Sequence, residues 1–201
     1  MELRDALGQI SEIRLQIARS GRFRGYRSAP VAATGLVALV TGVSQALLVP
    51  SPLDNLTDYL VLWVSAACAG LMITLGDVWR RNRQSQGMLQ KEATRFAIEQ
   101  FMPCVLAGGL VTLIISLRAP ELAWLLPGLW AILFSLGLFA SFRLLPRGIL
   151  GVAVFYLLAG CGYLWLISPE KALSPWSMVL LFGVGQFATA AVLLASEMKQ
   201  E

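Results

Sequence analysis

Few residues of this sequence could carry chemistry in an apolar environment. Two carboxylates, Asp77 and Glu99, stand beside long apolar runs, and two amides, Gln45 and Gln186, stand within such runs. A carboxylate inside a membrane span is a candidate for proton or ion relay, whereas one at the interface can simply hydrate or pair with a nearby arginine. Both carboxylates fall near the ends of their runs and close to arginines, so the sequence leaves a functional and a structural role open.

The two glutamines pose a different problem, because a long amide exposed to lipid is costly. We expect Gln45 and Gln186 to face the interior of a helical bundle, another subunit or a hydrated cavity.

Several reactive groups are missing. The sequence has no histidine, which removes bis-histidine haem ligation, the H-E-x-x-H zinc site and histidine-based acid–base catalysis. It also has no Walker A sequence and no G-x-S-x-G elbow. Its three cysteines all fall in apolar runs, where we expect buried thiols. The sequence therefore predicts no catalytic residue, metal or cofactor, and we expect a protein that is not an enzyme.

The elements that hold these residues are membrane helices. Hydrophobic residues make up 57% of the 201 residues and charged residues only 14%, which is outside the range of soluble domains. Six runs approach the roughly 20 apolar residues that cross a bilayer. We predict an all-α integral membrane bundle with spans at 29–49, 59–79, 98–117, 122–142, 148–167 and 176–195.

The basic residues predict the orientation of the bundle. Fourteen of the 16 Lys and Arg residues lie in the segment before span one, in the loops after spans two and four, and in the tail; only Arg118 and Lys171 lie on the other side. By the positive-inside rule both termini are cytoplasmic. We expect a cytoplasmic segment 1–28, a membrane domain 29–196 and a tail 197–201, in a plasma membrane of the bacterial inner-membrane type. Orientation accounts for the net charge of +4, so we expect no nucleic-acid partner.

Prolines mark the predicted cytoplasmic entrances of the three odd-numbered spans, and each is followed five residues later by a glycine. Proline suits the first turn of a helix, and a nearby glycine lets another helix approach closely. The pairs could have only these local roles, or could derive from a threefold repeat of a helical hairpin. Pro127, inside span four, predicts a kink. The three pairs are Pro30 with Gly35, Pro103 with Gly108, and Pro146 with Gly151.

Two cytoplasmic stretches have the spacing of amphipathic helices. Residues 2–18 and 88–101 repeat apolar residues at steps of three and four, which suits a partner protein, a second copy of the chain or the membrane surface. The basic linker between the first stretch and span one could contact lipid headgroups. The candidate partner-binding residues are Leu3, Leu7, Ile10, Ile13 and Ile17, and the candidate headgroup-binding residues are Arg22, Arg24 and Arg27.

Two functions fit this pattern. The first is a non-enzymatic membrane subunit or anchor that contacts a partner protein, or itself, through the cytoplasmic helices. The alternative is a small channel or carrier for an uncharged or weakly polar solute, which the glutamines, the repeat and the expected kink favour.

Overall fold

A computed structural model of the chain describes residues 27–84, 88–142 and 145–198, which form helices joined by short connections and contain no strand. Six of these helical segments are long and apolar enough to cross a membrane, which confirms the predicted all-helical fold with six helices of membrane-spanning length. The predicted amphipathic helix over residues 2–18, together with Arg22 and Arg24, falls outside the described residues.

The observed helices follow the predicted spans, but the helices that contain the second and third spans are longer than those spans. The third helix runs without a break through the predicted amphipathic stretch 88–101 into span three. The elements are α2 (Ser28–Leu48), α3 (Leu56–Gln84), α4 (Met88–Arg118), η1 (Pro120–Leu125), α5 (Leu126–Ser141), α6 (Ile149–Leu166), α7 (Pro169–Ala172), α8 (Pro175–Met178), the π-helical η3 (Val179–Gly183) and α9 (Val184–Met198).

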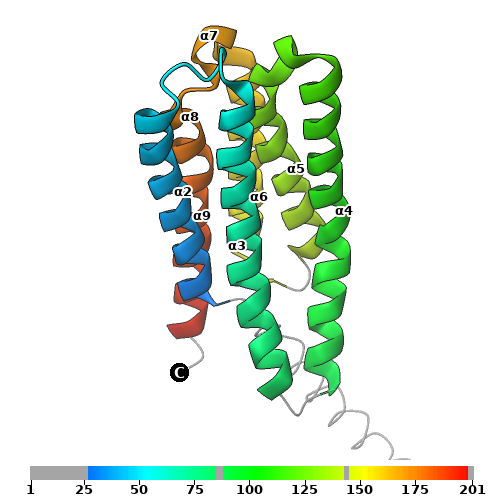
Figure 1. Cartoon of the computed structure of the whole chain (residues 1–201). Helices are drawn as coiled ribbons and strands as arrows, with labels where there is room; N and C mark the ends of the chain where they lie inside the picture. The colour runs from blue at the N-terminus through cyan, green and yellow to red at the C-terminus, as the bar shows by residue number, and fades with distance from the viewer. Residues whose placement is uncertain (1–26, 85–87, 143–144, 199–201) are drawn as a thin grey trace, which may run out of the picture.

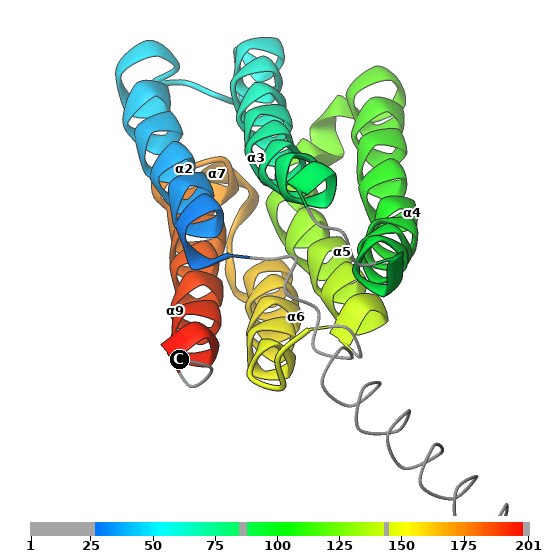
Figure 2. The ribbon, with the colours of Figure 1, turned by 90° about the horizontal axis from the view of Figure 1, so that it is seen from below.

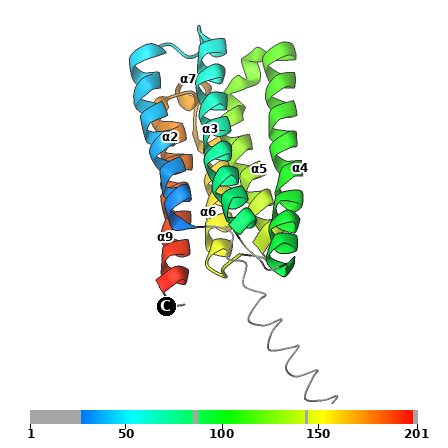
Figure 3. The same ribbon diagram turned by 60° about the horizontal axis from the view of Figure 1, so that its bottom comes forward.

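The six spans form a ring in chain order (Figures 1 and 2). Helix α2 packs against α3, α4 against α5 and α5 against α6, while α9 packs against both α6 and α2 and so closes the ring. The weakest junction lies between α3 and α4, which make few contacts with each other. Residues 27 and 198 come to the same end of the bundle, which is brought forward in Figure 3.

Helices α3 and α4 extend farther than the others at this end (Figure 1). They contain 29 and 31 residues, which corresponds to roughly 45 Å each, against a hydrocarbon core of about 30 Å. Both helices are therefore longer than an untilted span of such a core requires.

Helices α5 and α6 cross closely at Gly128 and Gly160. A Cβ added at Gly160 would lie 2.9 Å from the carbonyl oxygen of Gly128, and one added at Gly128 would lie 2.6 Å from the Leu164 side chain. Such a close approach of two backbones is the general use of small residues in membrane helix packing.

The prolines do not share one structural position. Pro30 is the third residue of α2, Pro103 lies deep inside α4, and Pro146 precedes α6. Pro127 occupies the first turn of α5, directly after the 3₁₀ segment η1, where its missing N–H leaves no helical hydrogen bond unmade; the expected kink there stays a prediction. The three Pro-Gly pairs thus have different surroundings, and the threefold repeat stays a hypothesis.

Candidate functional site: a central apolar cavity

The ring encloses a cavity of about 440 Å³, within the range of roughly 300–1,000 Å³ that is usual for small-molecule sites. Its walls come mainly from α2, α3, α4, α5 and α9. No charged residue is among the residues that line it within the described part of the chain. Charged solutes would therefore meet no counter-charge in this space.

Small side chains create the volume. Helix α3 contributes Ala66, Ala67 and Gly70 to the wall, and α4 contributes Gly108 and Gly109. A Cβ at Gly109 would meet nothing within 4 Å, and one at Gly108 would make only an ordinary contact at 3.8 Å with Leu133. Because these helices also make few contacts with each other, the seam between α3 and α4 is the thinnest part of the wall.

Aromatic side chains from α4, α5 and η3 form another part of the lining. The Phe134 ring lies 5.3 Å from Phe101, 4.8 Å from Tyr156 and 6.0 Å from Phe182, centroid to centroid. Phe101, Phe134 and Phe182 line the cavity, and Phe182 stands on the π-helical segment η3. Single π turns inside α-helices are frequent at functional sites. The wall offers flat apolar surfaces for stacking or for hydrocarbon.

Two polar groups at the cavity lack partners. The Ser141 hydroxyl is buried, with 3% of the residue exposed, and has no hydrogen-bond partner among the described residues. The half-buried Gln186 amide makes no hydrogen bond within the same part of the chain. An unpaired buried polar group costs about 1–3 kcal/mol, which applies to the Ser141 hydroxyl, and the half-buried Gln186 amide can hydrogen-bond a guest without breaking a bond within the protein.

The other polar groups of the wall are satisfied by the protein. The hydroxyls of Thr34, Thr74 and Thr112 each donate to a carbonyl of their own helix, as threonines in membrane helices commonly do. The Trp130 indole Nε1 donates to Thr112 Oγ1 at 2.8 Å and ties α5 to α4. Among the described residues, the Ser141 hydroxyl and the Gln186 amide are the hydroxyl and amide groups of the wall that make no hydrogen bond.

Gln45 does not belong to the cavity lining but ties three elements together. It is fully buried; its Nε2 donates to the Leu173 carbonyl at 2.6 Å, and its Oε1 accepts from Trp63 Nε1 at 2.7 Å. Trp63 comes from α3, and Leu173 from the connection between α7 and α8. Gln45 thus lies in the bundle interior and holds together the end of the bundle opposite to residue 27.

Neither candidate carboxylate reaches the cavity. Asp77 forms ion pairs with Arg81 at 3.0 Å and with Arg80 at 3.6 Å, while Glu99 pairs with Arg95 at 2.6 Å on an exposed face. Ion pairs with arginines of the same helix, at spacings of three and four residues, give both carboxylates structural partners. The geometry favours the structural interpretation of both.

The predicted packing glycines have unequal surroundings. A Cβ at Gly35 would lie 3.1 Å from the Phe187 ring, so α2 and α9 are close there. Gly108 borders the cavity, and Gly151 faces open space with nothing within 4 Å. The expectation of buried thiols is wrong for Cys68 and Cys161, which are exposed, whereas Cys104 is half-buried; Cys68 and Cys104 border the cavity.

Sequence reasoning missed two features of the structure. Glu197 accepts hydrogen bonds from the Ser28 backbone N–H at 3.0 Å and from its hydroxyl at 2.8 Å, and so caps the start of α2 from the end of α9. The second missed feature is the close crossing of α5 and α6 at Gly128 and Gly160. A serine at a helix start is a common capping signal, but its long-range partner has no local signature.

No protein-family model matches this chain, and no curated protein or solved structure matches it either. Within the described residues, no group of three or more His, Cys, Asp or Glu side chains could hold a metal ion.

Proposed function

We propose that this protein binds, and carries within the membrane, a lipophilic molecule that is uncharged or weakly polar. The observation that supports it best is the central cavity, whose apolar wall includes the unpartnered Gln186 amide and the buried, unpartnered Ser141 hydroxyl. A hydrocarbon-rich guest with one or two hydrogen-bonding groups matches this lining.

The guest enters, in this proposal, from the bilayer through the seam between α3 and α4. These two helices make few contacts with each other, and both line the cavity with small residues. Entry from lipid requires no dehydration of a charged group, which suits a wall without charges. We further propose that the arginine-rich end faces the cytoplasm, in a plasma membrane of the bacterial inner-membrane type.

Photolabelling of the full chain in lipid vesicles tests this proposal. The probe is a hexanol that carries a diazirine, because it is uncharged, mostly apolar and has one hydroxyl. Peptide mass spectrometry should locate adducts on cavity-lining residues such as Phe101, Trp130 and Gln186. Adducts confined to outward-facing residues such as Leu110 and Leu158, which are 59% and 66% exposed, would contradict the proposal.

A second candidate function is a membrane subunit or anchor that contacts a partner protein or a second copy. It is favoured by the length of α3 and α4, which exceeds what an untilted span of the bilayer core requires. In this proposal the stretches 2–18 and 88–101 provide the contact surface.

Replacing Leu7 and Ile10 together by Asp tests the anchor proposal. Burial of each apolar side chain is worth roughly 1.5–3 kcal/mol, so the two charges should abolish a micromolar complex while the bundle still inserts. Replacing Glu2 and Gln9 by Ala is a matched control off the apolar stripe. An unchanged set of co-purified proteins and an unchanged native mass would remove this candidate.

A further inference from the structure

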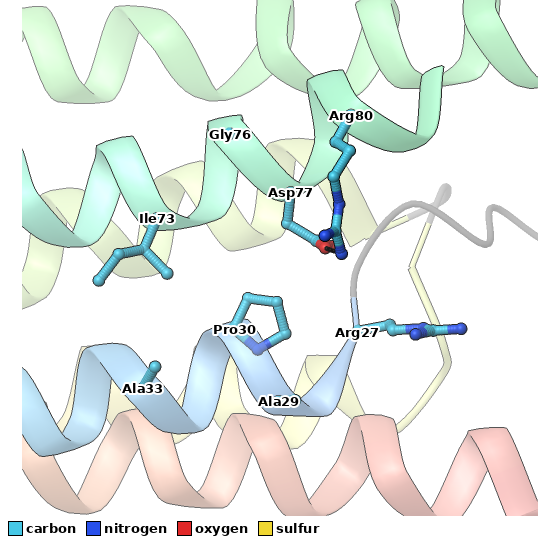
Figure 4. A pocket seen from close by; sticks show the side chains of 8 residues that line it. All are labelled: Arg27, Ala29, Pro30, Ala33, Ile73, Gly76, Asp77 and Arg80. Atoms are coloured by element: carbon cyan, nitrogen blue, oxygen red, sulfur yellow. Dashed lines mark ion pairs between the residues drawn. The ribbon is translucent and has the colours of Figure 1, made fainter. Parts of the chain in front are cut away.

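A second hollow lies outside the ring, between α2 and α3 at the arginine-rich end (Figure 4). This cleft has a volume of about 530 Å³ and is separate from the central cavity. Figure 4 shows Ile73, Asp77 and Arg80 projecting from α3 toward α2, with Pro30 and Ala33 on the opposite wall. The cleft is apolar toward the membrane interior and charged at its outer end.

The charges at its outer end leave an excess of arginine. Asp77 is held by Arg81 at 3.0 Å, and its contact with Arg80 is longer, at 3.6 Å. The Arg80 side chain is 72% exposed, so it can turn to another anion without losing a buried interaction. Arg27, at the first described position before α2, is also exposed and borders the same cleft.

The floor of the cleft suits a hydrocarbon chain. Pro30, Ala33 and Ile73 line it at successive depths below the arginines, and a Cβ at Gly76 would meet nothing within 4 Å. A basic pocket between membrane helices, with an apolar groove beneath it, has the chemistry of a phospholipid site. A soluble anion would use the arginines and leave the groove empty.

We infer that this cleft is a binding site for one anionic phospholipid. Its phosphate lies between Arg27 and Arg80, and one acyl chain runs along the groove beside Gly76. The site is distinct from the central cavity and does not depend on what that cavity binds. Arg22 and Arg24 are not needed for it.

Native mass spectrometry of the full chain, delipidated in detergent, tests the site. Phosphatidylglycerol and phosphatidylcholine with identical acyl chains are the two probes. We expect one phosphatidylglycerol to bind at least tenfold more tightly than phosphatidylcholine. Each of Arg27→Gln and Arg80→Gln should weaken that binding about fivefold, since one arginine near a lipid surface contributes on this scale. Arg83→Gln is the matched control, because Arg83 stacks over the Trp79 ring at 3.8 Å and does not line the cleft.

A steric variant tests the groove without changing any charge. Gly76→Leu fills open space beside the proposed acyl chain and should weaken phosphatidylglycerol binding, whereas Gly162→Leu, also with nothing within 4 Å, should not. Neither change introduces a clash with the backbone, so both variants should fold with unchanged helical circular dichroism. Equal affinity for the two lipids, an equal loss in Arg83→Gln, unchanged binding in Gly76→Leu, or displacement by glycerol phosphate would each overturn the inference.

Discussion

Replacing Gln45 by Leu should destabilise the bundle strongly, because the side chain makes two short hydrogen bonds in a fully buried position. The substitution keeps most of the volume but leaves the Trp63 N–H and the Leu173 carbonyl unpaired. Each unpaired buried group costs about 1–3 kcal/mol, and measured side-chain hydrogen bonds in membrane proteins average about 0.6 kcal/mol. We therefore expect a loss of about 2–4 kcal/mol in the free energy of unfolding.

The assay is equilibrium unfolding in mixed micelles, followed by helical circular dichroism. Thr41→Val is the control on the same helix, because the buried Thr41 hydroxyl donates only to the Val37 carbonyl one turn away. We expect it to cost less than about 1 kcal/mol, since that carbonyl keeps its place in the helix.

A double substitution separates the lost hydrogen bond from lost packing. Trp63→Phe removes the indole N–H that Gln45 accepts. The double variant, with Gln45→Leu and Trp63→Phe, should therefore lose about 1 kcal/mol less in the free energy of unfolding than the two single variants lose in sum. A Gln45→Leu variant as stable as Thr41→Val, or a strictly additive pair, would refute the role assigned to Gln45.

Three further predictions address the rest of the fold. Gly160→Ala should lower the free energy of unfolding by more than about 2 kcal/mol, because its Cβ would lie 2.9 Å from a carbonyl oxygen of the facing helix. Gly162→Ala, with open space around its Cβ, should change that free energy by less than about 0.5 kcal/mol. Equal unfolding midpoints of the two variants would contradict the close crossing of α5 and α6. Glu197→Ala should lower stability by about 1–2 kcal/mol through loss of the α2 cap, measured as a shift of the thermal midpoint, and a wild-type midpoint would show that the cap contributes nothing. In a cysteine-free background, a cysteine at Ser85 should react with an impermeant thiol reagent only from the cytoplasm and one at Ser51 only from outside, and the reverse pattern would invert the proposed orientation.

The six spans could be predicted because each depends on local composition. A run of about 20 apolar residues has few soluble alternatives, and the helices that begin at Ser28 and Ile149 start within one residue of the predicted spans. The predicted third span, 98–117, lies within the apolar segment Arg95–Arg118, and the helix that contains it begins earlier, at Met88, since charged residues reduce hydropathy without interrupting a helix. The position of Pro127 in the first turn of α5 could not be predicted, because hydropathy does not show that a 3₁₀ segment precedes the proline.

The candidate site could be predicted only in part. An amide in an apolar run has to find a partner or a cavity, so Gln45 and Gln186 were identifiable, but the sequence does not say which of the two is satisfied by Trp63. The cavity itself depends on small residues of α3 and α4 on the two sides of the seam between these neighbouring helices. That juxtaposition arises from the helix arrangement and has no signature in the spacing along either helix.

The central claim, that the cavity accepts a lipophilic guest, is tested most directly by the saturation of photolabelling with the diazirine-bearing hexanol. The wild-type chain should saturate at one label per chain. Gly108→Leu, which places a larger side chain in the cavity, should lose that label, while Gly151→Leu, whose side chain extends into open space outside the cavity, should keep it. Labelling that rises without saturation and is the same in all three proteins would contradict the account.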